Sequence, residues 1–235
     1  MAIRKKKNKQ KETQDDELLV DIGQVSQDTS DFIDRNQTKI FGGLTILVLL
    51  IGGYLAYQNF HVKPQQQAVV EQMSQAQFQF ERDSFAVALT NPGAGYPGFL
   101  DIIDQYGGTD AGNLASYYAG VSYLNLGQFD AAISFLNDFS ADGRVMPIMK
   151  YGALGDAHAE KGDLGEALSY YEKAANTNSN EALTPYYLKK AAMLSEKQGN
   201  NAEALEMYQK IKSEYPLSAD ATDIDKYIVR AKSKG

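Results

Sequence analysis

The feature that most constrains the fold of this chain is a segment that recurs three times in its C-terminal part. The copies begin at Asn113, Ile148 and Pro185, and the glycines near their middle, at positions 127, 162 and 199, lie 35 and 37 residues apart. The sequence around each glycine predicts helix, turn and helix. One helical hairpin cannot bury its apolar face alone, so the recurrence predicts a stack of hairpins that share a core.

Small residues recur midway along both predicted helices of every copy, where they let the two helices lie close together. They are Gly120, Gly155 and Ala192 in the first helices, and Ala132, Ala167 and Ala204 in the second. Larger side chains are expected to fill the layer between the helices. These are Tyr123, Leu136, Tyr171 and Tyr208.

This pattern resembles the tetratricopeptide repeat, in which W-x2-L-G-x2-Y is followed by A-x3-F and then by P. The resemblance covers residues 113 to 216, although the chain has no tryptophan. His158 and Ser195 stand at the tyrosine position of the second and third copies, and Pro216 supplies the closing proline once. Thr184 is expected to be the N-cap of the third copy, with Pro185 in the first turn of its helix. The resemblance implies an all-α fold, a helical solenoid.

An uncharged stretch of 18 residues precedes the repeats, from Ile40 to Tyr57. That length can span a bilayer. Its ten Leu, Ile, Val or Phe residues contribute roughly -3 to -6 kcal/mol to insertion. Because 39 residues precede it, the stretch is expected to be an uncleaved transmembrane anchor rather than a signal peptide.

Basic residues are distributed unequally around this anchor, which predicts its orientation. Lys63 is the one cation in the fifteen residues that follow the anchor, whereas eight precede it. The eight are Arg4, Lys5, Lys6, Lys7, Lys9, Lys11, Arg35 and Lys39. Under the positive-inside rule, the N-terminus is cytoplasmic and the large C-terminal domain lies outside, which in a Gram-negative cell is the periplasm beside the inner membrane.

The tail before the anchor carries two further patterns. RKKKNKQK at residues 4–11 is read as a topology signal, with a nucleic-acid or ribosome contact as the alternative. Apolar residues recur at helical spacing between Leu18 and Ile33 and predict a short amphipathic segment, on the membrane or against a partner.

Helices are expected on both sides of the repeats, because the stack needs polar caps. A long helix is predicted from Pro64 to about Ala88, followed by a break at NPGAGYPG and a shorter helix around Ile102. The expected organisation is a cytoplasmic tail, an anchor, N-terminal helices, three repeats and a capping helix. Their ranges are 1–38, 39–58, 59–110, 111–217 and 218–235.

Composition excludes several function classes. The net charge of -7 argues against a nucleic-acid partner, and the absence of cysteine removes thiolate metal sites and thiol nucleophiles. His61 and His158, the two histidines, do not predict a shared metal site. Asp101 and Asp104 are expected to be solvated, and the glycine-rich segments lack the phosphate-binding pattern. No catalytic residue, cofactor or metal is therefore predicted.

The first helices of the repeats are expected to line an inner groove that binds a partner. Positions two, five, nine and twelve of each copy face it, where the alternative is packing against a neighbouring helix. They are Leu114, Tyr117, Val121 and Leu124; Met149, Gly152, Asp156 and Ala159; and Tyr186, Lys189, Met193 and Glu196. Such an apolar and aromatic surface suits extended polypeptide. Tyr117 and Val121 replace the lysine and asparagine with which related repeats clamp a terminal carboxylate, so no such clamp is expected.

The architecture of tail, anchor and repeat domain is similar to that of the YfgM-like family, an ancillary subunit of the SecYEG translocon. This resemblance implies a role beside the translocon, together with a PpiD-like periplasmic chaperone of the prolyl-isomerase type, in handling exported polypeptides. A scaffold subunit of another envelope secretion or assembly complex is the alternative. An enzyme hidden in the helical domain is the least favoured reading.

Overall fold

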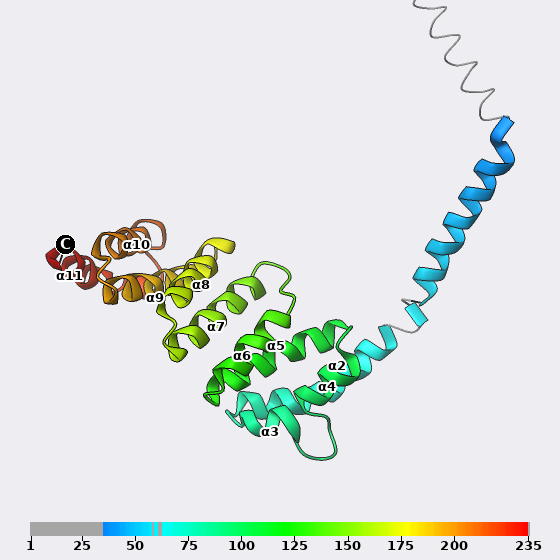
Figure 1. Cartoon of the computed structure of the whole chain (residues 1–235), viewed down its shortest axis with the longest axis horizontal. Helices are drawn as coiled ribbons and strands as arrows, with labels where there is room; N and C mark the ends of the chain where they lie inside the picture. The colour runs from blue at the N-terminus through cyan, green and yellow to red at the C-terminus, as the bar shows by residue number, and fades with distance from the viewer. Residues whose placement is uncertain (1–34, 58, 61–62, 235) are drawn as a thin grey trace, which may run out of the picture. The chain divides into compact units, whose positions relative to one another are not determined.

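The computed structural model of the protein describes residues 35–57, 59–60 and 63–234, and these residues form helices and no strand (Figure 1). The predicted basic run, the amphipathic segment and His61 lie outside the described residues. The chain divides into two compact units between Lys63 and Pro64, and each is described by itself. The predicted all-α fold class, a helical solenoid that follows one apolar helix in the chain, is confirmed.

The apolar N-terminal helix runs from Arg35 to Tyr57 and has a mean hydropathy of 2.0. Twenty-three residues of α-helix extend about 34 Å, slightly more than the hydrocarbon core of a bilayer. Large apolar side chains are exposed along it, among them Phe41 at 60% and Leu50 at 68%. The helix is long and apolar enough to cross a membrane.

Three helices open the second unit: α2 (Lys63–Glu81), α3 (Phe85–Thr90) and α4 (Phe99–Tyr106). The prediction of one helix reaching Ala88 was wrong, because α2 ends at Glu81 and the chain turns at Asp83, whose φ is 57°. The turn brings the rings of Phe80 and Phe85 within 5.4 Å of each other, edge to face. The Phe80 ring also lies edge to face with Phe99 and Tyr118 of the core, so aromatic contacts stabilise the chain on both sides of the turn.

The three repeats form the helical hairpins α5 and α6, α7 and α8, and α9 and α10. Their bounds are Asp110–Asn125 and Phe129–Asp138, Met146–Lys161 and Leu164–Thr177, and Leu183–Lys197 and Asn201–Glu214. The turn glycines Gly127, Gly162 and Gly199 have φ values of 72°, 92° and 87°. This left-handed conformation strains residues with a Cβ, which explains why glycine recurs at each turn.

The third repeat opens differently from the prediction. Helix α9 begins at Leu183, so Thr184 lies inside it rather than at its N-cap, and Pro185 lies in its first turn. Asn180 does the capping instead, since its Oδ1 accepts hydrogen bonds from the backbone N–H groups of Ala182 (3.0 Å) and Leu183 (2.9 Å). The buried Thr184 hydroxyl accepts from the Asn180 N–H at 2.9 Å. The asparagine therefore satisfies the free donors of the helix start.

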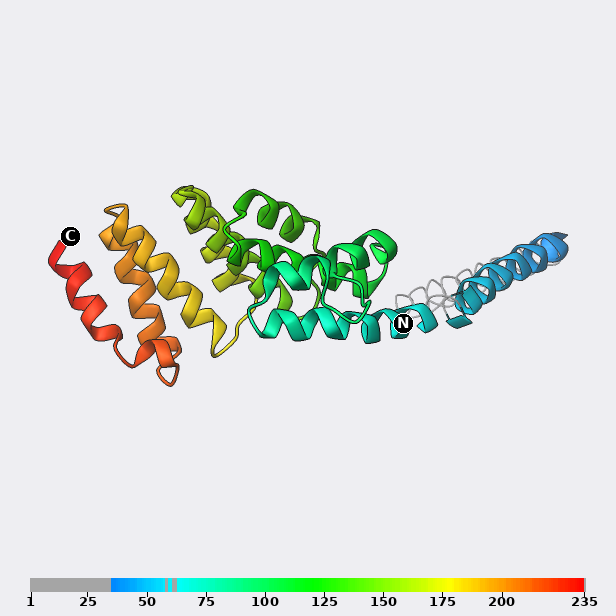
Figure 2. The same ribbon diagram turned by 90° about the horizontal axis from the view of Figure 1, so that it is seen from below.

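Small residues bring the helices of each hairpin together, as predicted. A Cβ added at Gly120 would lie 2.6 Å from Leu136 Cγ, and one added at Gly155 would lie 2.5 Å from Tyr171 Cδ1. Successive helices pack against one another along the unit, and the first helices also touch directly, α5 against α7 and α7 against α9 (Figure 2). The first helices of neighbouring repeats therefore lie side by side.

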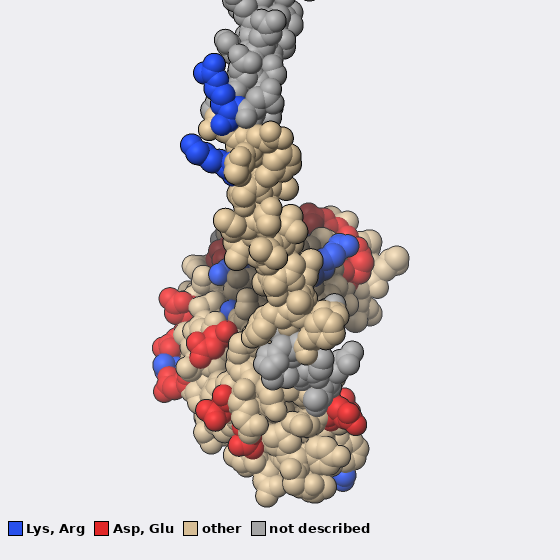
Figure 3. Space-filling view, turned by 90° about the vertical axis from the view of Figure 1, so that its right-hand side faces the viewer, with Lys and Arg blue, Asp and Glu red and all other residues tan. Residues whose placement is uncertain are grey.

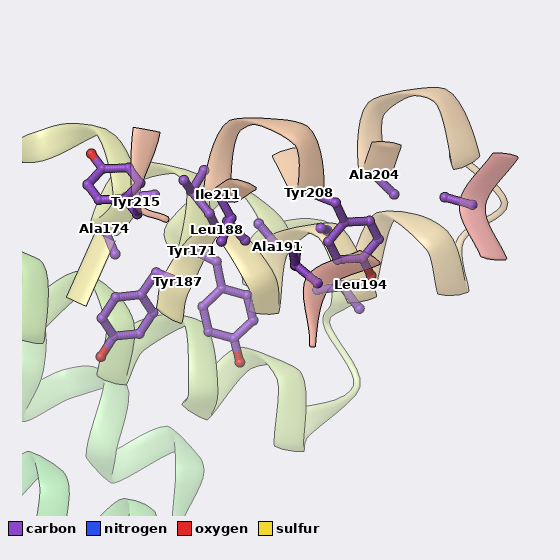
Figure 4. Close-up of a cluster of buried hydrophobic side chains, with 14 of the residues drawn as sticks. Tyr171, Ala174, Tyr187, Leu188, Ala191, Leu194, Ala204, Tyr208, Ile211 and Tyr215 are labelled. Carbon is purple, nitrogen blue, oxygen red and sulfur yellow. The ribbon is translucent and has the colours of Figure 1, made fainter. Parts of the chain in front are cut away.

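The core of the second and third repeats continues into the C-terminal helix. Figure 4 shows the rings of Tyr171, Tyr187 and Tyr208 among leucines and alanines of α9 and α10. A short 3₁₀ turn, η2 (Ala219–Ala221), leads to α11 (Ile224–Lys234). Ile224, Ile228 and Ala231 are buried on one face of α11, which covers the apolar end of the last hairpin.

Candidate functional site

The residues predicted to line a groove fall on the adjoining helices α5, α7 and α9, but their exposure differs widely. Tyr186 and Met193 on α9 are 40% and 47% exposed. Tyr117 on α5 is 9% exposed. Gly152 and Glu196 are buried as well. The others are half-buried: Leu114, Val121, Leu124, Met149, Asp156, Ala159 and Lys189.

Five of these side chains pack against the core: Leu114, Tyr117, Val121, Leu124 and Met149. Tyr117 lies with its ring centroid 5.3 Å from that of Phe139, and burial raises its pKa to about 12. Val121 and Met149 pack against the same middle cluster, and Leu114 packs against the cluster formed with α2 to α4. Their surface in the folded unit is mostly covered by neighbouring helices.

A hollow of about 510 Å³ lies between the first and second repeats and is also lined by Lys190 of the third. It brings together the predicted residues Leu124, Asp156 and Ala159 with residues from α6, α8, α9 and the turn at Gly127. Its lining is Leu124, Asn125, Gly127, Phe129, Asp156, Ala159, Glu160, Tyr171 and Lys190. Apolar side chains from α5 and α6 therefore face charged and hydroxyl groups from α7, α8 and α9.

Asp156 is the centre of a small polar network in this hollow. Its Oδ1 accepts hydrogen bonds from the Tyr171 hydroxyl at 2.7 Å and from Lys190 Nζ at 2.5 Å. Burial is the largest single influence on Lys190 and disfavours its ammonium form, but hydrogen bonds and charge interactions with Asp156 and Tyr186 together outweigh burial and raise the lysine pKa. Burial and the same carboxylate raise the pKa of Tyr171. Lys190 therefore stays charged and paired, and Tyr171 stays neutral.

Lys190 also links the hollow to an exposed stripe on α9. Its Nζ lies 5.1 Å from the ring centroid of Tyr186 and 5.3 Å from that of Tyr171. Residues spaced by three or four positions share a helix face, so Tyr186, Lys190 and Met193 form one row, called the α9 stripe below. An exposed aromatic ring and a flexible thioether offer adaptable apolar contact beside a charge.

Two groove positions of the third repeat, those of Lys189 and Glu196, are paired with the C-terminal segment. Lys189 Nζ lies 3.2 Å from Asp220 and 3.1 Å from Asp223. Glu196, whose side chain is 5% exposed, accepts hydrogen bonds from Arg230 at 2.7 and 2.5 Å. Lys234 Nζ adds a bond of 2.9 Å to the same carboxylate. Hydrogen bonds from Arg230 and then Lys234 lower the pKa of Glu196 to about 2.

A second hollow, of about 560 Å³, lies between α2, the loop at residues 91–98 and α4. Tyr96, Pro97 and Asp101 are among its lining residues. Asp101 Oδ2 accepts a 3.0 Å hydrogen bond from the Gly98 N–H, which caps α4. This carboxylate therefore has a structural role, and the hollow is polar without a converging set of reactive groups.

The chain has no cysteine, so histidines and carboxylates are the candidate metal ligands of the described segments. In that part of the chain no three His, Cys, Asp or Glu side chains are placed to hold a metal ion. His158 stacks on Tyr170 at 5.3 Å, and its Nδ1 lies 3.6 Å from Asp163 Oδ2 at the turn between α7 and α8. The imidazole is thus part of a helix-turn contact.

Family comparisons match the same segments that form the hairpins. Residues 114–142 and 187–218 match one tetratricopeptide repeat description, and residues 151–181 match a second. No curated protein sequence matches the chain. The fold and the matched segments thus establish a chain with tetratricopeptide repeats, a class of helical repeat that mediates contacts between proteins.

Sequence reasoning missed Lys190 and Tyr171 as members of the site. It selected Lys189, whose ammonium group turns to η2 and α11, and it assigned Tyr171 to the layer between helices. The spacing of Tyr186, Lys190 and Met193 was a usable signal, because these positions share a helix face. The contact between Lys190 and Asp156 could not be predicted from helical spacing, because it joins residues 34 positions apart.

Proposed function

We propose that this chain is a membrane-tethered protein-interaction module that binds polypeptide along the inner side of its repeats. The observation that carries the proposal is the hollow between the first two repeats, continued by the exposed α9 stripe. The α9 stripe and most residues of the hollow belong to the first helices of a class of repeat that mediates protein contacts. Extended polypeptide can place side chains in such a surface without a deep pocket. The module is proposed to bind and not to catalyse.

The tether is proposed to be the helix Arg35–Tyr57, with the N-terminus in the cytoplasm and the repeat domain in the periplasm. The support is its length and hydropathy, together with eight cations before the apolar stretch. A membrane anchor holds the domain near its partners and raises their effective concentration.

Orientation can be tested by thiol labelling, because the chain has no native cysteine. A membrane-impermeant maleimide should label Ser213→Cys on exposed α10 in cells with a permeable outer membrane. The matched variant Ala2→Cys should be labelled only after the inner membrane is opened. The reverse labelling pattern would overturn the proposed orientation.

The finer proposal is an accessory subunit of the SecYEG translocon, acting with a PpiD-like chaperone on exported polypeptides. Its support is the similarity of the tail, anchor and repeat architecture to the YfgM-like family. A domain held at the exit of the translocon would meet chains before they fold, when their apolar side chains are available. An adaptable surface of aromatic, methionine and charged groups suits such varied partners.

The alternative is a scaffold subunit of another envelope secretion or assembly complex that uses the same surface for one folded partner. Affinity purification through a C-terminal tag in mild detergent, followed by mass spectrometry, separates the two. Recovery of SecY, SecE and SecG with a periplasmic prolyl isomerase supports the translocon role. Their absence beside one other stoichiometric complex overturns that role in favour of the scaffold.

A further inference from the structure

The hollow between the first two repeats has a chemistry that selects among polypeptides. Resting on the proposed function, we propose that it receives a lysine or arginine side chain of the bound polypeptide, while apolar neighbours of that residue lie on the α9 stripe. The occupant is thus a segment with a basic residue flanked by apolar ones.

The lining of the hollow matches the two parts of a basic side chain. Leu124 and Phe129 offer an apolar wall from α5 and α6, and Asp156 and Glu160 offer carboxylates from α7. Lysine and arginine carry a long apolar stem below a charged head and bury the two parts in different surroundings. The stem can pack on the apolar wall while the head reaches the carboxylates.

The charges around the hollow favour a cation over an anion. Lys190 is already paired with Asp156, and Lys161 is paired with Asp130 at 2.7 Å. Glu160 is exposed and makes no ion pair with any residue of the described segments. With Asp163 at 3.7 Å from Lys161, four carboxylates face two ammonium groups. The group that lacks a partner here is therefore a carboxylate.

An anionic side chain would have to displace Asp156 from its network. That displacement breaks the hydrogen bonds from Tyr171 and Lys190, at 2.7 and 2.5 Å, and leaves Asp156 without its partners. Removing partners from a partly buried charge is unfavourable. A cation at Glu160 leaves this network intact, so the geometry favours lysine or arginine.

The domain as a whole carries an unequal charge distribution that supports the same choice. Residues 64–143 contain nine acidic residues and one basic residue, Arg82. Residues 144–235 contain thirteen of each. Figure 3 shows red acidic side chains scattered over the face of the domain turned to the viewer, with few blue ones among them. The acidic excess thus belongs to the half of the domain that contributes α5 and α6 to the hollow, and a negative charge there attracts basic partners and speeds their encounter.

The spacing between the hollow and the α9 stripe defines the length of the occupant. Lys190 lines the hollow, and Tyr186 and Met193 lie four residues before it and three after it on α9. At 1.5 Å per residue these are displacements of about 6 and 5 Å along the helix. An extended chain advances about 3.3 Å per residue, so neighbours one or two residues from the basic side chain reach the stripe.

The test uses the full chain in lipid nanodiscs and three fluorescent peptides that differ at one central residue. That residue is lysine, glutamine or glutamate, flanked by leucines in all three. Fluorescence anisotropy should give the tightest Kd for the lysine peptide, with roughly fivefold weaker binding for glutamine, the upper range for one partly exposed ion pair. The glutamate peptide should bind most weakly, and added salt should reduce the lysine preference.

Two variants separate this inference from the proposed function. Glu160→Gln should abolish most of the lysine preference, whereas Glu206→Gln, the same change on exposed α10, should not. Equal binding of all three peptides, unaffected by Glu160→Gln but weakened by Tyr186→Ala with Met193→Ala, would overturn the cation site and leave the groove standing. Binding that no inner-side variant alters would overturn both.

Discussion

The first two repeats and the third repeat use equivalent inner positions for different purposes. Leu124 and Asp156, from the first and second repeats, line an open hollow. In the third repeat, Glu196 occupies the position equivalent to Leu124, and Lys189 is a further groove position; both are paired with charged residues of the segment from η2 to α11. The inner wall is therefore open in one part and closed by the C-terminal segment in the other.

The comparison teaches that a repeat position does not determine whether its side chain meets solvent, a partner or a neighbouring helix. The next helix along the stack determines which of these the side chain contacts. Where α11 carries Arg230 and Lys234 opposite Glu196, the position becomes a structural contact. Where α9 presents Lys190 and Tyr186 beside Asp156, polar groups gather around a hollow.

The largest effect is expected from Glu196→Ala, which removes the contact between the third repeat and α11. The change removes the carboxylate that accepts hydrogen bonds from Arg230 and Lys234. It also removes the acceptor of the hydroxyl of fully buried Tyr208, which lies 3.3 Å from that carboxylate. The free energy of unfolding should fall by about 2–4 kcal/mol, less than for a fully buried pair because the cations are half exposed. Hydrogen exchange should accelerate mainly in α11.

Glu206→Ala on α10 is the matched control for that change and should alter stability by no more than about 0.5 kcal/mol. Equal exchange in α11 for both variants would contradict the role of Glu196 as the contact that closes the third repeat.

Acid should weaken the same contact by a smaller amount, because protonated glutamate still fills its space. The folded-state pKa of Glu196 is about 2, below its ordinary value of 4.5. Its contribution to stability is therefore complete above about pH 4.5 and is lost as the pH falls toward about 2. The stability difference between the native chain and Glu196→Gln should shrink over this window. A difference that stays constant from pH 5 to pH 3 would rule out the ion pair as its source.

A larger side chain at position 155 should disturb the packing beside the hollow between the first two repeats. An added Cβ would lie 2.5 Å from Tyr171 Cδ1, so Gly155→Ala must shift the ring whose hydroxyl binds Asp156. We expect a loss of about 1–3 kcal/mol in urea unfolding. Gly165→Ala is the control, since its Cβ meets no atom within 4 Å and alanine favours the helix. A stabilised Gly155→Ala chain would contradict the close packing of α7 on α8.

The smallest effect is expected from Asp156→Ala. The change removes the acceptor of Tyr171 and Lys190, but both Asp156 and Lys190 are about 30% exposed, so water can replace the lost bonds. Thermal unfolding should show a loss of about 1 kcal/mol. A loss as large as that of Glu196→Ala would mean that the hollow is a structural contact like the third repeat.

The repeating hairpins could be predicted from the sequence, because turns and the packing of adjacent helices depend on residues that are close in the chain. Gly127, Gly162 and Gly199 identified the turns through their backbone freedom, and Gly155 identified close helix packing. The break at Asp83 was missed, because it depends on two phenylalanine rings meeting after the turn.

The candidate site was predicted less completely, because exposure depends on contacts between distant residues. Tyr117 was expected to face the groove, yet its ring packs on Phe139 of the following segment. Glu196 has partners 34 and 38 residues away, and helical spacing within α9 carries no information about them. The placement of a groove on the first helices stays a prediction until partners are mapped.

The most direct test is photo-crosslinking of the full chain in its native membrane, with a benzophenone amino acid at one position at a time. Position 193 on the α9 stripe, where Met193 is 47% exposed, should capture polypeptide. Position 217 is the control, because Leu217 is apolar and 98% exposed but lies in the turn between α10 and η2, not on the first helix of a repeat. Capture at 193 well above that at 217 is the predicted result. Equal capture at both positions, or more at 217, would contradict an inner-side binding surface.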